Sequence, residues 1–168
     1  MGMIKYEDGK PIKKFTEYYL PQMNITTKAK EINGLNRDTL KKKGAKVFSK
    51  GASERIVNFL NEDKDLPIVA HNVWYDLDKA LMKTFKRVNM QHILPPKERW
   101  RCTMKMSQKL PGKPLALLDD ILEYFNYDRR DLSKFHDAMT DAGLTAQVYM
   151  KMMTAPPPSV SHLGFTKE

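Results

Sequence analysis

Apolar and polar residues along this chain alternate in a pattern that predicts strands followed by helices. Near the start, apolar and β-branched residues over 3–6 and 12–20 flank Asp8 and Gly9, a pair typical of the tight turn in a β-hairpin. Further on, the run 65–71 predicts a buried strand, and apolar residues at helical spacing over 74–85 predict a helix directly after it. The pattern therefore predicts an α/β fold.

Several further elements complete this picture. Ser53 is expected to cap a helix that continues through Leu60. Other helices are expected over 26–31, 36–42, 115–124 and 137–153, with a short strand at 101–103. A chain of 168 residues is long enough for one core and too short for two. We therefore expect one domain over residues 1–154 and a Pro-rich tail over 155–168.

The charge of the chain points to a polyanionic partner. There are 29 Lys and Arg against 20 Asp and Glu, a formal charge of +9, which favours nucleic acid, although solubility alone is an alternative reading. Basic residues gather in 28–50 (eight against two acidic) and 97–114 (six against one), whereas 119–141 has seven acidic residues and three basic. This arrangement is expected of a protein whose basic loops bind phosphates and whose carboxylates bind cations. Charged helix faces exposed to solvent give the same pattern.

Two classes of protein do not fit the composition. No apolar run approaches the ~18 residues that a membrane span needs, and no signal-type stretch follows Met1. The single cysteine, Cys102, cannot close an internal disulfide or form a Cys-rich zinc site. We expect a cytoplasmic protein in a reducing compartment, without a membrane partner.

Two segments carry the candidate chemistry. Asp76 lies in the first turn of the helix after the central strand, at the crevice where open α/β sheets bind ligands. Asp141 lies in the last helix, and His136 must precede that helix, because five positions along one helix would turn the two side chains apart. Small residues on one face of the last helix allow a close approach that would bring Asp141 to Asp76. Structural alternatives remain: a first-turn Asp also complements the helix dipole, His136 could be a surface loop residue, and His71 and Asn72 could equally be turn residues.

These segments resemble a known family. Residues 70–76 and 136–141 look like the second and third exonuclease motifs of the DnaQ-like proofreading exonucleases, the epsilon-subunit type with a ribonuclease-H-like fold. Segment 111–118 is similar to the family's stretch before a Leu-rich helix, and 32–35 resembles its loop that meets the 3′ end. The resemblance implies a mixed sheet flanked by helices and a 3′ to 5′ exonuclease acting on single-stranded DNA or RNA ends.

The resemblance also implies the roles of individual residues. Asp76 and Asp141 would be ligands of Mg²⁺ or Mn²⁺, two ions in a complete site, and His136 would be the general base of two-metal hydrolysis. Contacts to nucleic acid are expected from the 3′-end loop, the basic segments and the turn before Asp76: Gly34, Leu35, Lys41, Lys42, Lys43, His71, Asn72 and Arg101.

One part of the family pattern has no counterpart here. The family's first motif, Asp-x-Glu-Thr on the opening central strand, supplies two further carboxylates, whereas the nearby pair Glu7 and Asp8 lies in a turn with the wrong spacing. We expect the sheet to be split where that strand would lie, with the strand either lost by truncation, supplied by another segment, or supplied by a second protein chain or a homo-oligomer that completes the sheet. The alternative is a catalytically inactive nucleic-acid-binding or scaffold module of the same fold. Asp76 and Asp141 alone would offset only half of the positive charge of two divalent ions.

Overall fold

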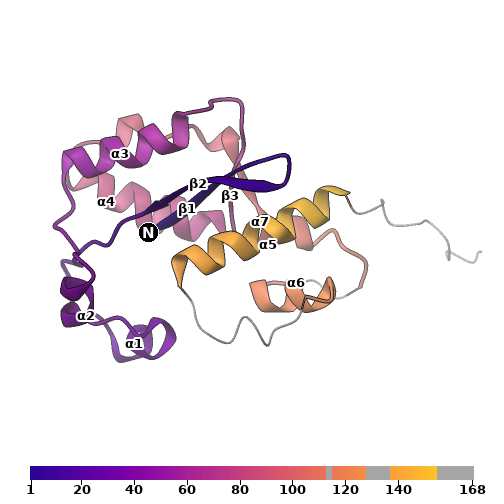
Figure 1. The fold of residues 1–168 in the computed structure, drawn as a ribbon, viewed down its shortest axis with the longest axis horizontal. Coiled ribbons are helices and arrows are strands. Elements are labelled where there is room, and N and C mark those ends of the chain that lie inside the picture. The colour runs from indigo at the N-terminus through magenta and orange to yellow at the C-terminus, as the bar shows by residue number, and fades with distance from the viewer. Residues whose placement is uncertain (113–114, 128–136, 155–168) are drawn as a thin grey trace, which may run out of the picture.

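The computed structural model describes residues 1–112, 115–127 and 137–154, which form an α/β fold with two pairs of strands (Figure 1). Strands β1 (Gly2–Glu7) and β2 (Lys10–Thr16) form the expected antiparallel hairpin. Its turn residues Asp8 and Gly9 both have positive φ, 49° and 76°, the backbone that matches the twist of a two-residue hairpin. Strands β3 (Ile68–Ala70) and β4 (Trp100–Cys102) form a parallel pair.

The helices lie close to their expected places. They are α1 (Thr27–Asn33), α2 (Arg37–Lys42), α3 (Lys50–Asn61), η1 (Trp74–Leu81), α4 (Met82–Lys86), η2 (Gln91–Ile93), η3 (Lys97–Arg99), α5 (Thr103–Ser107), α6 (Leu118–Tyr124) and α7 (Ala138–Thr154). The expected cap at Ser53 is wrong. Ser49 caps α3, accepting from the Ala52 N–H at 3.3 Å, while Ser53 is buried inside the helix. Its hydroxyl bonds back to the Ser49 carbonyl, because the helix begins one turn earlier than the apolar pattern indicates.

The strands do not form one sheet. β1 pairs with β2 and β3 pairs with β4, and within the described ranges no strand lies between β1 and β3. Helix α7 packs against both β1 and β3 (Figure 1), while the apolar cluster on α3, η1 and α4 packs against Met3 and Phe15 of the hairpin. The expected split of the sheet is therefore present, and α7 bridges it.

The buried apolar side chains form two separate clusters. The first joins α3 to η1 and α4 through Ile56, Val57, Leu81 and Phe85, with Met3 and Phe15 of the hairpin packed against it. The second joins α6 to α7 through Ile121, Leu122 and Val148. Because the strands lie between these clusters without a continuous ladder, each side of the fold has a core of its own.

The expectation that the strand over 65–71 is buried is only partly met. Ile68, Val69 and Ala70 are all half-exposed, and no residue of β1 is buried either. The physical reason is a cavity of about 480 Å³ that runs between β1 and β3. A continuous apolar run is typical of a strand covered on both faces and paired on both edges, and here one edge of that strand is open.

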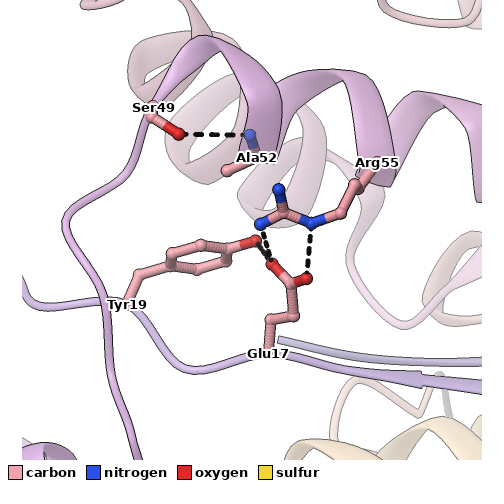
Figure 2. A network of polar contacts seen from close by, with 5 residues as sticks. All are labelled: Glu17, Tyr19, Ser49, Ala52 and Arg55. Carbon is pink, nitrogen blue, oxygen red and sulfur yellow. Dashed lines mark hydrogen bonds and ion pairs between the residues drawn. The ribbon is translucent and has the colours of Figure 1, made fainter.

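A polar network fixes the end of the hairpin to α3 (Figure 2). Arg55 of α3 donates from Nε and Nη2 to the two carboxylate oxygens of Glu17, at 2.7 and 2.9 Å, and the Tyr19 hydroxyl donates to the same carboxylate. The Arg55 hydrogen bonds hold the pKa of Glu17 below its usual range. A two-pronged contact of this kind sets orientation as well as distance, so it fixes the angle at which the chain leaves β2.

The hairpin also lies very close to α7. A Cβ placed on Gly2 would be 2.8 Å from the backbone carbon of Ala138 and from the nitrogen of Met139. Contacts this short do not occur for real side chains, and backbone atoms cannot move aside as a flexible side chain would. Glycine is therefore required at this point of the β1–α7 contact.

We predict that Gly2→Ala destabilises the protein by about 1–3 kcal/mol, because it forces β1 away from α7. Thermal unfolding measures the effect. Gly51→Ala is the matched control: its Cβ meets the Arg55 guanidinium at an ordinary 3.7 Å, and alanine is favoured over glycine inside a helix. Equal melting temperatures for Gly2→Ala and the unmodified protein would contradict this account.

Candidate functional site

Asp76 is positioned by the turn that follows β3. Asn72 adopts a left-handed backbone with φ of 65°, and its carbonyl accepts from the Tyr75 N–H at 2.8 Å. The expected helix then starts as the π-helix η1, in which the Met82 N–H reaches back to the Leu77 carbonyl. Such wide turns are rare and concentrate at functional sites. They place Asp76 in the first turn, with Leu77 and Leu81 buried behind it.

The environment of Asp76 disfavours its charge. Its side chain lines the cavity between the two strand pairs. Burial raises the pKa of Asp76 to about 6, an effect that a hydrogen bond within its own residue only partly offsets. A carboxyl group whose pKa lies this close to neutrality is a candidate for a functional group, because cation binding or proton transfer can change its state.

His71, at the end of β3, is half-buried and held by two hydrogen bonds. Its Nε2 lies 2.9 Å from the Ala116 carbonyl and its Nδ1 lies 3.0 Å from the hydroxyl oxygen of the buried Thr103. A carbonyl only accepts, so Nε2 carries the hydrogen and Nδ1 accepts from Thr103 in the neutral ring. Burial lowers the pKa of His71, and the negative charge of Asp141 acts in the opposite direction. The start of α7 is therefore close enough to the end of β3 for Asp141 to act on His71.

Asp137 caps α7 and fixes where Asp141 lies. Its carboxylate accepts from the N–H groups of Met139 and Thr140 at 3.2 and 3.3 Å, and its carbonyl accepts from the Asp141 N–H at 2.9 Å. This is the usual geometry of an aspartate at a helix N-terminus. Ala142, the residue after Asp141, lines the same cavity as Asp76. The structure thus brings the neighbourhood of Asp141 and the Asp76 side chain to one cavity.

The third expected catalytic residue, His136, lies outside the described residues, as does the tail over 155–168. Within the described ranges, no group of three or more His, Cys, Asp or Glu side chains could hold a metal ion. The carboxylates that the structure describes here therefore do not make a complete metal site.

The expected nucleic-acid contacts lie in several places. Gly34 ends α1 in a left-handed conformation with φ of 66°, and the Leu35 N–H donates to the Asn33 side chain at 2.9 Å. Lys41 and Lys42 form the exposed last turn of α2. These two helices project from one side of the molecule (Figure 1).

Two more of the expected contacts lie beside these elements. Lys43, just after α2, is exposed, with its ammonium 5.1 Å from the centre of the Tyr18 ring. Arg101 is an exposed residue of β4 whose guanidinium donates to the Glu98 carbonyl at 2.6 Å. Nucleic-acid binding by all these residues, and by His71 and Asn72, stays a prediction.

Two aromatic residues beside Asp76 were not singled out from the sequence. Trp74 and Tyr75 are 56% and 61% exposed, unusual for large aromatic side chains, and the Lys79 ammonium lies 4.5 Å from the centre of the Trp74 ring. Two adjacent aromatics before an acidic residue are visible in the sequence. The exposure of the two rings cannot be read from the sequence, because it depends on how the helix is wound and packed.

No helix in the part of the chain that the structure describes is both long enough and apolar enough to cross a membrane.

Comparison with known proteins gives related sequences along nearly the whole chain. The DNA polymerase III subunit epsilon of Aquifex aeolicus is 26% identical over 154 residues, which make up 91% of this chain and 70% of that protein. The PolC-type DNA polymerases III of Thermotoga petrophila and Thermotoga maritima are each 24% identical over an alignment 169 positions long, which covers 99% of this chain. The chain spans 11% of the length of these two PolC-type relatives.

A family model described as exonuclease, RNase_T, matches residues 1–149, a region that includes both aspartates and the strands around the cavity. With this match the ribonuclease-H-like interpretation of the fold is confirmed, and the chain belongs to the RNase_T family of exonucleases, of the DnaQ-like type.

Proposed function

We propose that this chain is a metal-dependent 3′ to 5′ exonuclease that acts on single-stranded ends. The observation that carries the proposal is Asp76: a carboxyl group with a raised pKa, at the end of β3, on the wall of a cavity that Ala142 of α7 shares. The relatives bear the name DNA polymerase III, which supports DNA as the nucleic acid. A cytoplasmic location is also proposed, since Cys102 is a free thiol of the kind found in reducing compartments.

Mg²⁺ or Mn²⁺ is the proposed cofactor, with Asp76 and Asp141 as its protein ligands. Both ions prefer carboxylate oxygens, and a pair of them would stabilise the charge that develops in phosphodiester hydrolysis. The donor set is too small for two ions, because two carboxylates offset half of the charge and the described residues hold no group of three ligands. Further carboxylates must therefore come from outside the described residues.

The chain's own residues would bind and orient the substrate. His71 stays neutral between Thr103 and Ala116 and ties the end of β3 to the start of α5 and to the segment before α6, which makes it a positioning residue. The exposed rings of Trp74 and Tyr75 offer faces on which bases can stack beside Asp76. His136 is proposed as the base that accepts the proton of the attacking water.

A second candidate function is favoured by the incomplete ligand set. A catalytically inactive module of this fold would bind nucleic acid or act as a scaffold through the basic segments, without any need for cations at Asp76. The two candidates differ in one respect that can be measured, namely whether any cleavage depends on the two aspartates.

In a preparation that degrades single strands, we expect Asp76→Asn and Asp141→Asn each to abolish activity, because each removes a ligand charge and keeps the shape. His136→Ala should lower the rate by ~10²–10⁴ and leave metal binding largely intact. Asp78→Asn is the matched control, since Asp78 lies on the same helix and pairs with Lys97 at 3.0 Å. Cleavage that survives both aspartate changes would belong to a different site.

Binding of single-stranded DNA should weaken steeply as salt rises, with a log–log slope near −0.7 for each phosphate neutralised. Replacing Lys41, Lys42 and Lys43 together with glutamine should make that slope shallower. The variant neutralises fewer phosphates, so the DNA releases fewer counterions on binding. A triple replacement of Lys79, Lys83 and Lys86 with glutamine, on η1 and α4, removes the same number of charges and is the control for overall charge. Fluorescence anisotropy over a salt series measures the slopes, and a salt-independent affinity would refute binding through phosphates.

Asp76 should also make stability depend on pH. Its pKa is about 6 in the folded protein against 3.8 as the ordinary value, so the native state holds more protons between these values. The contribution of Asp76 to the free energy of unfolding should then fall as pH rises from about 4 to above 6, and the difference between the unmodified protein and Asp76→Asn isolates it from His71, whose lowered pKa acts in the opposite direction. At pH 7, Asp76→Asn should be more stable than the unmodified protein by at most about 3 kcal/mol. Urea unfolding at pH 4 and pH 7, with Asp78→Asn as control, measures this difference, and an Asp76→Asn variant less stable at pH 7 would contradict it.

A further inference from the structure

We propose that Thr103 and Ser107 of α5 are positioning residues for the candidate site. Their side-chain hydroxyls hold the segment before α6, and through it the first turn of α7 with Asp141, against the end of β3 that leads to Asp76. This role rests on the proposed function for what the two aspartates do, whereas the hydrogen bonds themselves do not depend on it.

The two hydroxyl groups lie on one buried face of α5. Thr103 and Ser107 begin and end this helix, and both are 0% exposed. Residues four apart in a helix project from the same side. A buried hydroxyl is costly unless it has a hydrogen-bond partner, so the partners of these two groups show what this face of α5 holds.

Both hydroxyls bind groups outside α5. The Ser107 hydroxyl lies 2.7 Å from the carbonyl oxygen of Leu115 and 2.8 Å from that of Met104 in its own helix. A serine in a helix commonly bonds back to the preceding turn, but here the shorter contact joins the helix to the next segment of the chain. The Thr103 hydroxyl lies 3.0 Å from Nδ1 of His71, a residue 32 positions earlier.

His71 extends the contact of Thr103 to a second carbonyl. Its Nε2–H donates to the Ala116 carbonyl at 2.9 Å, while its Nδ1 accepts from Thr103. A neutral imidazole has one donor and one acceptor, so the ring cannot turn over without losing both hydrogen bonds. Two consecutive carbonyls, those of Leu115 and Ala116, therefore have partners. Ser107 holds the first directly, and Thr103 holds the second through His71.

The segment held in this way leads into the second apolar cluster. Helix α6 packs on α7 through that cluster, and the side chains of Leu115 and Leu144 pack against it. Leu144 lies three positions after Asp141, about one helical turn. The charge of Asp141 acts in turn on His71, as expected if the two ends of this connection meet. Fixing Leu115 and Ala116 to the end of β3 thus fixes where the first turn of α7 lies.

Direct packing of α7 on β3 does not replace these hydrogen bonds. The α7 residues that line the cavity beside β3 include the small side chains of Ala142 and Ala146, which interlock little with a neighbouring strand. Apolar attraction has no preferred direction, whereas a hydrogen bond weakens steeply when its angle changes. Packing therefore brings the helix to the strand, and the buried hydroxyls fix its position along the strand.

The first test is the ring proton of His71. Thr103→Val removes the hydroxyl and keeps the branched shape, so the Nε2 proton should exchange with water at least about tenfold faster. Thr103→Ser should restore slow exchange, and Thr145→Val, which removes another buried hydroxyl, should leave it unchanged. NMR of nitrogen-15-labelled protein measures these rates, and Thr103→Ala has the same expected result if valine is not tolerated. An unchanged ring proton in the folded variants that lack the hydroxyl would overturn the proposal.

Backbone hydrogen exchange shows whether the two hydroxyls hold α7. In Thr103→Val and in Ser107→Ala, the amides of α7 should exchange at least about tenfold faster, while those of α3 in the first apolar cluster should change by less than about twofold. Ser107→Ala should leave the ring proton of His71 unchanged, because both hydrogen bonds of the ring remain. Equal acceleration in α3 and α7 would reveal a general loss of stability and would overturn the positioning role, as would unchanged exchange in α7.

Kinetics connect the hydroxyls to the proposed reaction. In a preparation that degrades single strands, Thr103→Val should lower kcat by ~10–100-fold and change KM by less than about threefold, because it displaces Asp141 and leaves the nucleic-acid contacts intact. Thr103→Ser should restore most of kcat. An unchanged kcat would overturn the positioning role and leave the exonuclease proposal standing. Absence of cleavage in every preparation would overturn the exonuclease proposal, and the two exchange measurements would still decide whether the hydroxyls hold α7.

Discussion

The close packing of α7 across two strand pairs is the contact on which the rest of this structure depends. No ladder of hydrogen bonds runs from β1 to β3 in the described part of the chain, so the relative position of the two half-sheets comes from side-chain packing. Helix α7 contacts β1 and β3, and the cluster on α3, η1 and α4 packs on Met3 and Phe15 of the hairpin and on Trp100 of β4. The packing of α7 requires Gly2, where a single added carbon would meet the α7 backbone at 2.8 Å. Packing of this kind tolerates little change in volume, and for that reason the hairpin keeps a defined orientation although one of its edges is open.

The same helix links the fold to the candidate site. Its first turn carries Asp141, whose charge acts on His71 at the end of β3, and its next two turns present Ala142 and Ala146 to the cavity that Asp76 lines. Both aspartates therefore depend on how α7 meets the strands. The site has an energetic cost, since a partly buried carboxyl with a raised pKa destabilises the folded state wherever it is ionised. Such costs are typical of groups retained for chemistry rather than for stability.

The features that the sequence predicts well are those set by local chemistry. Asp8 and Gly9 supply the two left-handed residues of the hairpin turn, and Asp76 and Asp141 lie in the first turns of their helices as expected. The features that it does not predict depend on tertiary packing. Ser49 and Ser53 are equally good caps in isolation, and burial of Ser53 against the core decides between them. The π-helical turn at Trp74 and the half-exposed state of Val69 also depend on what lies beside them.

The open sheet and the incomplete metal site have a common physical origin. Asp76 lies on the wall of the cavity that separates β1 from β3, so its solvation depends on whatever fills that space. Water in the cavity would leave the strand edges hydrated and the Asp76 carboxyl only partly desolvated. Exclusion of that water would strengthen every charge interaction around Asp76. A shortage of carboxylates would then become more costly, because cations held in a drier site need more nearby negative charge. The solvation of this cavity and the number of negative charges that a cation at Asp76 needs are thus coupled.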